Sequence, residues 1–83
     1  MVDSAVITML DKIGNPIGDF ELPLKIPMKE LEKKLVALLK AMDSDIYVCL
    51  EKIKVEYNGK ILDEEDTLYQ NAVWDGSIIK LIY

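Results

Sequence analysis

The chain has no histidine, no arginine and a single cysteine among its 83 residues. The absence of histidine excludes histidine-based catalytic triads, imidazole metal sites and histidine switches near neutral pH. One cysteine cannot form an intrachain disulfide, a zinc knuckle or an iron–sulfur cluster. Without arginine there is no guanidinium group for bidentate contacts with bases. We therefore expect a protein that is not an enzyme and that carries no metal or cofactor.

Positive charge is also in short supply, because ten lysines face fifteen acidic residues and the net charge is −5. An acidic protein repels phosphate, which disfavours binding to nucleic acid or to an acidic membrane surface. The longest stretch without a charged side chain, residues 67–74, is far too short to span a bilayer. The first residues do not have the pattern of a signal peptide. We expect a cytoplasmic protein without direct membrane insertion, peripheral at most to a membrane complex.

Apolar residues make up 51% of the chain and charged residues 30%, which is typical of a globular protein. A chain of 9.4 kDa buries about 63% of its surface on folding, enough for one core. We therefore predict a single domain over residues 1–83.

Two strands and a turn are predicted in the first quarter of the chain. Residues 5–11 are rich in β-branched side chains, and residues 19–24 alternate between polar and apolar types. The segment 14–18 between them contains Gly, Asn and Pro, which favour a turn. Pro23 has no N–H group, which predicts that this strand lies at the edge of the sheet or that its hydrogen-bonding side points outward at this residue. For the first strand two inward-facing sets remain open, Val6, Thr8 and Leu10 or Ala5, Ile7 and Met9.

The apolar period changes to that of a helix over residues 27–42. Pro27 suits the first turn, although no Ser, Thr, Asp or Asn stands before it as a cap. The segment 46–50 is apolar and its structure stays open. The predicted buried stripe of the helix consists of Met28, Leu31, Leu35, Leu38, Leu39 and Met42.

The second half returns to strand patterns. Residues 53–57 alternate, with Ile53, Val55 and Tyr57 predicted to face inward, and Asn58-Gly59 is a strong hairpin signal before a short strand at 60–62. Residues 67–73 are typical of one helical turn, and residues 77–83 of a last strand. Right-handed connections favour this last strand in the centre, beside the first. The order predicts an α+β fold, a mixed four- to five-stranded sheet with one helix packed across one face.

The run Ile53-Lys54-Val55-Glu56-Tyr57-Asn58-Gly59-Lys60-Ile61-Leu62 resembles the third and fourth strands of ubiquitin, so the fold is expected to be a ubiquitin-like β-grasp. From Ala5 onward the chain also resembles the small bacterial ubiquitin-like proteins of the YukD/EsaB type, which accompany type VII secretion systems. The features that match are the Leu24-Lys25-Ile26-Pro27-Met28-Lys29 segment before a leucine-rich helix and the Trp74-Asp75-Gly76-Ser77 segment. This resemblance implies an accessory secretion component whose partner is a protein, either a membrane-embedded component or the secretion ATPase.

Two departures from ubiquitin bear on function. Protein conjugation and sulfur transfer require a flexible tail ending in Gly-Gly, whereas this sequence stops at Tyr83 on the last predicted strand. If Tyr83 is the natural end, the protein is a non-conjugating interaction module. The alternatives are a modifier or sulfur carrier with its tail further on, or a ubiquitin-like domain cut from a larger protein.

Glu56 stands at the centre of the region that forms the apolar recognition patch in ubiquitin, so receptors of that patch should not bind.

The candidate docking surface lies on the last strand, where Ile78, Lys80 and Ile82 are predicted to face outward. Lys54 and Glu56 are expected to be their neighbours on the adjacent strand. Two exposed isoleucines around a lysine would form a small contact surface for a protein. The alternative is that they are ordinary strand-forming residues, or that the predicted register is wrong by one residue.

Three further features have weaker functional interpretations. Trp74 lies at a predicted turn and is either a contact anchor or a lid over the edge of the sheet. Cys49 is expected to be a small buried hydrophobic residue and not a nucleophile, because no base accompanies it. The acidic run 63–66 lacks the alternate spacing of a calcium loop and is expected to be a solvated loop.

Overall fold

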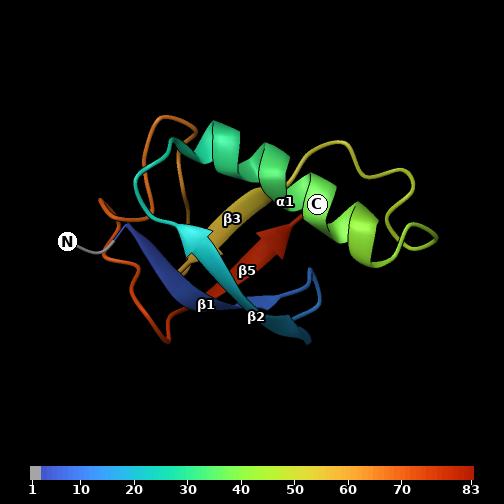
Figure 1. Ribbon diagram of the computed structural model, residues 1–83, viewed down its shortest axis with the longest axis horizontal. Helices are drawn as coiled ribbons and strands as arrows, with labels where there is room; N and C mark the ends of the chain where they lie inside the picture. The colour runs from blue at the N-terminus through green and yellow to red at the C-terminus, as the bar shows by residue number, and fades with distance from the viewer. Residues whose placement is uncertain (1–2) are drawn as a thin grey trace.

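The computed structural model describes residues 3–83, in which five strands form one sheet and a single helix lies across one of its faces (Figure 1). The sheet has the order β2-β1-β5-β3-β4, with β5 parallel to β1 and antiparallel to β3. This is the predicted α+β arrangement. The elements are β1 Ser4–Leu10, β2 Pro16–Pro23, α1 Met28–Met42, β3 Lys54–Tyr57, β4 Lys60–Ile61 and β5 Ile78–Ile82.

The last strand lies in the centre of the sheet, as the connection rules predict. β5 pairs with the strands of both halves of the chain, β1 on one side and β3 on the other. The prediction for Pro23 is also confirmed, because β2 pairs only with β1 and forms one edge of the sheet. The C-terminal strand therefore joins the two halves of the sheet.

The core lies between α1 and the sheet, and it decides the open question of the first strand. Ala5, Ile7 and Met9 face α1 and are buried, so Val6, Thr8 and Leu10 lie on the opposite face. Only one face of the sheet is covered by a helix, and a shift by one residue would expose the larger apolar set to water. The fully buried large side chains are Ile7, Met9, Leu24, Met28, Leu31, Leu35, Leu39, Ile53, Leu62, Leu68, Ile79 and Leu81.

The helix α1 begins without a side-chain cap, as its sequence indicates. Its first N–H groups are instead satisfied by the loop that follows β4. Met28 donates to the carbonyl oxygen of Asp66 at 2.7 Å, and Lys29 donates to that of Glu64 at 3.0 Å. A long-range loop therefore replaces the local cap that helix N-termini usually have.

Several predicted boundaries differ from the structure. β2 begins at Pro16, earlier than predicted, because the pairing with β1 continues through an irregularity next to Met9. β4 ends at Ile61, although Leu62 still donates a hydrogen bond to Val55. Residues 67–73 keep the predicted single helical turn, because the N–H groups of Asn71 and Ala72 donate to the carbonyl oxygens of Leu68 and Tyr69 with the three-residue spacing of a 3₁₀-type turn. The last buried residue of α1 is Leu39, so Met42, predicted within the stripe, is half exposed.

The segment 46–50 forms turns in which one apolar residue reaches the core. The N–H group of Tyr47 donates to the carbonyl oxygen of Asp43, and the N–H group of Leu50 donates to that of Tyr47. These short-range bonds hold the segment in successive turns. Leu50 is buried, whereas Ile46 is 71% exposed. Cys49 is exposed, so the prediction of a buried cysteine is wrong. The tight turns leave its side chain on the outside.

Candidate protein-binding surface

The outward-facing residues of β5 are placed as predicted. Ile79 and Leu81 are fully buried under α1, so the pleat directs Ile78, Lys80 and Ile82 to the opposite face of the sheet. Ile78 is 53% exposed, and the other two are partly exposed. The alternative register, in which these isoleucines would be buried, is excluded.

Neighbouring strands extend this surface on both sides. On β3, Glu56 lies opposite Lys80 and Lys54 lies opposite Ile82, as expected. The sheet face, as we call this surface, also includes residues that the sequence did not single out: Thr8 beside Ile78, Leu10 beside Lys80, and Ile61 opposite Glu56. The parallel pairing of β1 with β5 brings Thr8 and Leu10 there, and the open register of β1 was the reason they were missed.

The sheet face combines exposed isoleucines with charges of both signs. Ile61 and Ile78 are each about half exposed, and Lys80 lies between Ile78 and Ile82 on β5. Lys80 and Glu56 stand opposite each other, so their charges are adjacent across two strands. Apolar groups of this kind contribute binding energy when covered, and the charges orient a partner.

Lys54 differs from its neighbours, because its ammonium group is engaged elsewhere. Its Nζ lies 3.0 Å from an oxygen of Glu64 and 3.8 Å from an oxygen of Glu32. The hydrogen bond to Glu64 raises the pKa of Lys54 and lowers that of Glu64. Lys54 therefore belongs to a charged cluster formed by β3, α1 and the loop after β4. Its ammonium group is paired within that cluster and is not available to a partner on the sheet face.

Trp74 belongs to a separate aromatic cluster. Its ring packs edge-on against Tyr69, with ring centres 5.5 Å apart, and the ammonium group of Lys25 lies 5.2 Å from the centre of the Tyr69 ring. Trp74 is 48% exposed. The turn is held by reciprocal bonds, in which the Trp74 N–H donates to the Ser77 hydroxyl and the Ser77 N–H to the Trp74 carbonyl. The structure thus pairs Trp74 with Tyr69, a contact that sequence reasoning missed.

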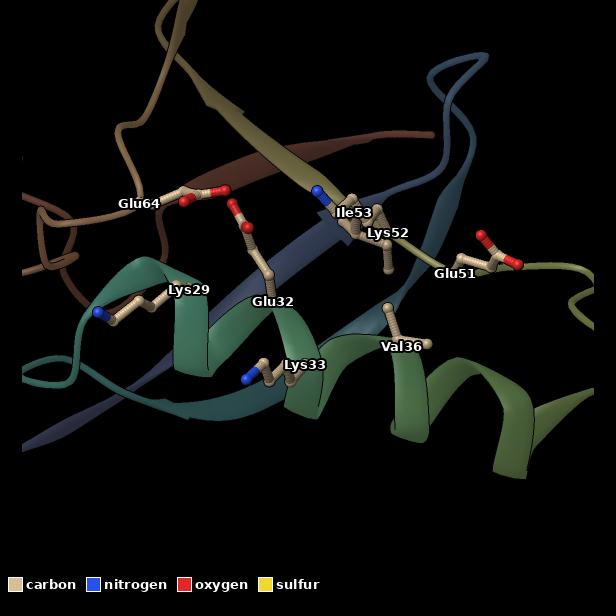
Figure 2. Close-up of a pocket in the computed structure, with 8 residues that line it drawn as sticks. All are labelled: Lys29, Glu32, Lys33, Val36, Glu51, Lys52, Ile53 and Glu64. Carbon is tan, nitrogen blue, oxygen red and sulfur yellow. The ribbon is translucent and has the colours of Figure 1, made fainter.

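A groove of about 430 Å³ lies between α1 and the segment before β3 (Figure 2). Glu32 of α1 is the one charged residue that is buried in the part of the chain described, with 8% of its surface exposed. Its Oε2 has no hydrogen-bond partner, and Figure 2 shows its carboxylate directed toward that of Glu64. The groove is lined by Lys29, Lys33, Val36, Glu51, Lys52 and Ile53 together with Glu32 and Glu64.

Burial raises the pKa of Glu32, and the positive charge of Lys54 opposes this only in part. One feature of the sequence points to this residue, since Glu32 follows Leu31 at the margin of the helical stripe. Its partners come from β3 and from the loop after β4, and no local pattern predicts them. Glu32 is therefore a carboxylate whose charged form is disfavoured in the folded protein.

We expect Glu32→Gln to change how the free energy of unfolding depends on pH. Because the pKa of Glu32 is raised on folding, its favourable contribution is complete below the unfolded value of about 4.5 and is lost as pH rises through the folded value. The difference in stability between Glu32→Gln and the parent should therefore move in favour of the variant as pH rises through this window. Urea denaturation at a series of pH values measures it.

Glu30→Gln is the matched control, because Glu30 is an exposed acid on the same helix. The same series of measurements on this variant shows what the loss of one exposed negative charge does. A difference between Glu32→Gln and the parent that does not change with pH would contradict the assignment of a raised pKa.

Nowhere between residues 3 and 83 does a helix have the length and apolar character needed to cross a bilayer. The same residues contain no group of three or more acidic or cysteine side chains arranged to hold a metal ion.

Comparison with known proteins identifies the fold. No protein-family model and no curated protein sequence matches the chain. Among solved structures, the ubiquitin-like domain of the Mycobacterium tuberculosis type VII secretion protein ECCD1 is similar over 100% of both chains, with a TM-score of 0.76 and 22% identity. The ubiquitin-like domain of EccD5 from Mycobacterium xenopi has a TM-score of 0.76 and 18% identity, covering 98% of this chain and 94% of that one. The ubiquitin of Caldiarchaeum subterraneum has a TM-score of 0.67 and 22% identity, covering 95% and 91%. The chain therefore has the ubiquitin-like β-grasp fold.

Proposed function

We propose that this ubiquitin-like domain is a non-enzymatic, non-conjugating interaction module, an accessory component of a type VII-like protein secretion system. The observation that carries the proposal is the similarity, over nearly the whole of each chain, to two domains of type VII secretion proteins, ECCD1 and EccD5. The sequence resemblance to the YukD/EsaB type supports the same system. A fold alone does not specify function, so the site must supply the rest of the argument.

The proposed docking site is the sheet face. Its isoleucines are the exposed apolar groups of a regular, rigid surface, because β5 is the central strand and is paired on both sides. A rigid surface loses little conformational entropy when a partner binds. Trp74, half exposed on its own turn, provides a second contact. The proposed partner is a protein, either a membrane-embedded secretion component or the secretion ATPase.

Chemical crosslinking in the native cell, followed by capture of the protein and mass spectrometry, tests this function. We expect enrichment of a membrane-bound secretion component or of the secretion ATPase relative to cells that lack the protein. A ladder of many covalent adducts that survive denaturation would instead indicate a protein modifier and would overturn the proposal. Enrichment of proteins unrelated to secretion would overturn it as well.

A further inference from the structure

The groove beside α1 lies apart from the sheet face and is built around an incompletely paired carboxylate. One wall is formed by the side chains of Lys29, Glu32 and Val36 on α1, and the facing wall by the segment that leads into β3, including Ile53 (Figure 2). Glu64 lies at one end of the groove. Its residues come from three separate parts of the chain, so the groove exists only in the folded protein.

The charged end of the groove has one more negative than positive group in direct contact. The single ammonium group of Lys54 is shared between Glu64, at 3.0 Å, and Glu32, at 3.8 Å. The second oxygen of Glu32 is buried and accepts no hydrogen bond. A buried carboxylate oxygen without a donor is costly, and a ligand that supplies the donor removes that cost.

The lysines that line the groove do not fill this need. Lys29 pairs with Glu65 at 3.4 Å, and the ammonium groups of Lys29 and Lys33 point away from the Glu32 carboxylate (Figure 2). The positive charge of Lys52 lowers the pKa of Glu32, but the ion pair that Glu32 forms among residues 3–83 is with Lys54 and not with Lys52. Among residues 3–83, no side chain or backbone group donates to Oε2.

We propose that this groove binds an arginine side chain on an extended segment of a partner protein. Oε2 is closed off from solvent in this structure, so the Glu32 carboxylate would rotate to meet the ligand. The guanidinium group would then donate to Glu32 and to a carboxylate oxygen of Glu64, while its methylene groups lie against Val36 and Ile53. Arginine fits this site better than lysine, because its planar group presents several donors at once and can bridge two carboxylates without displacing Lys54.

The composition of the chain restricts the source of this arginine. The 83 residues contain no arginine, so a second copy of them cannot supply the group. The net charge of −5 attracts a basic partner at long range. The proposed occupant is a basic segment of a different protein. This inference does not depend on the proposed secretion function, because it uses neither the sheet face nor the type of partner captured there.

Titration of the ¹⁵N-labelled 83-residue chain with a short capped Gly-Gly-Arg-Gly-Gly peptide tests the proposal by NMR. We expect saturable shifts at Glu32, Val36 and Ile53 at peptide concentrations up to about 10 mM. A peptide with citrulline in place of arginine keeps the shape but loses the charge, and its affinity should be lower by about ten-fold or more. A lysine peptide should also bind more weakly.

Three variants sharpen the test. Glu32→Gln should weaken the preference for arginine over citrulline, because only the Glu64 carboxylate then remains to pair with the guanidinium group. Glu30→Gln, on the exposed side of the same helix, should retain the full preference. Lys52→Gln should increase the affinity, since it removes a nearby competing cation. Spectra and melting curves of the free variants establish that each is folded.

The proposal is overturned if no saturable shifts occur, or if the arginine and citrulline peptides bind equally. Shifts spread over the acidic surface and unchanged in Glu32→Gln would show a non-specific attraction and would also overturn it. If a lysine peptide binds as tightly as the arginine peptide, the proposal that the groove recognises a guanidinium group is contradicted. None of these outcomes bears on capture of a secretion component, so the two proposals can fail separately.

Discussion

Ile79→Ala is expected to lower the free energy of unfolding by about 3 kcal/mol, whereas Ile78→Ala should change it by less than about 1 kcal/mol. The two residues are neighbours on the central strand β5 and undergo the same chemical change. Ile79 is fully buried against α1, and Ile78 is 53% exposed on the sheet face. The difference between the two losses in free energy of unfolding therefore measures the effect of burial.

The large loss at Ile79 has two causes. Removal of the side chain forfeits the free energy of burying it, and it leaves a cavity that the surrounding residues fill only in part. Met9 on β1 lies beside Ile79, and both are fully buried, so the cavity would open where strands from the two ends of the chain meet. Collapse of that region is difficult because β5 is paired on both sides.

Denaturation by urea, monitored by circular dichroism, gives both free energies. Similar denaturant slopes for the two variants would show that the unfolded states are comparable. Equal losses for Ile78→Ala and Ile79→Ala would contradict the register of β5 and, with it, the position of the sheet face. Because native proteins are stable by about 0.05–0.15 kcal/mol per residue, a chain of 83 residues has about 4–12 kcal/mol, and Ile79→Ala should remain folded enough to measure.

The combined substitution Ile78→Asp and Ile82→Asp is expected to reduce capture of the proposed secretion partner by about ten-fold or more. Both side chains point away from the core, so the substitution should leave the fold intact while placing two negative charges on the proposed docking surface. A carboxylate covered by a partner without a hydrogen-bond donor is costly to desolvate. Quantitative crosslinking in the native cell measures the loss.

Ile46→Asp provides the control for this experiment. Ile46 is 71% exposed, but it lies in the turns after α1 and not on the sheet face. It should leave capture unchanged, and Trp74→Ala should produce a smaller loss than the double variant. Normal capture and normal secretion with the double variant would exclude the sheet face as the docking site.

The repeating patterns of the sequence were sufficient to predict the elements and the fold. The period of two in residues 53–57 and the period of 3.6 after Pro27 each reflect burial of one face, which is a local property. The Asn58-Gly59 turn likewise depends only on adjacent residues, and Asn58 has the positive φ of 53° that this turn requires. The weakest predictions were at boundaries such as Pro16, where pairing with another strand extends an element beyond its local pattern.

The candidate surface was predicted in part, and the omissions have a common cause. Ile78, Lys80 and Ile82 follow from alternation within one strand, whereas Thr8 and Leu10 join them only through the parallel pairing of β1 and β5. Ile61 joins through the pairing of β4 with β3. Whether residues from different strands share a face depends on their register, and a single strand pattern does not contain that information.

By itself, the sequence determined the fold class, the central place of the last strand and the edge position of Pro23. It also determined that histidine chemistry and arginine contacts from this chain are absent. Only the tertiary structure decided which face of β1 is buried, that Cys49 is exposed, and that Lys54 joins Glu32 to Glu64. The physical reason is that periodicity records whether a residue faces the core, whereas the identity of its neighbours depends on how distant segments pack together to bury their apolar faces.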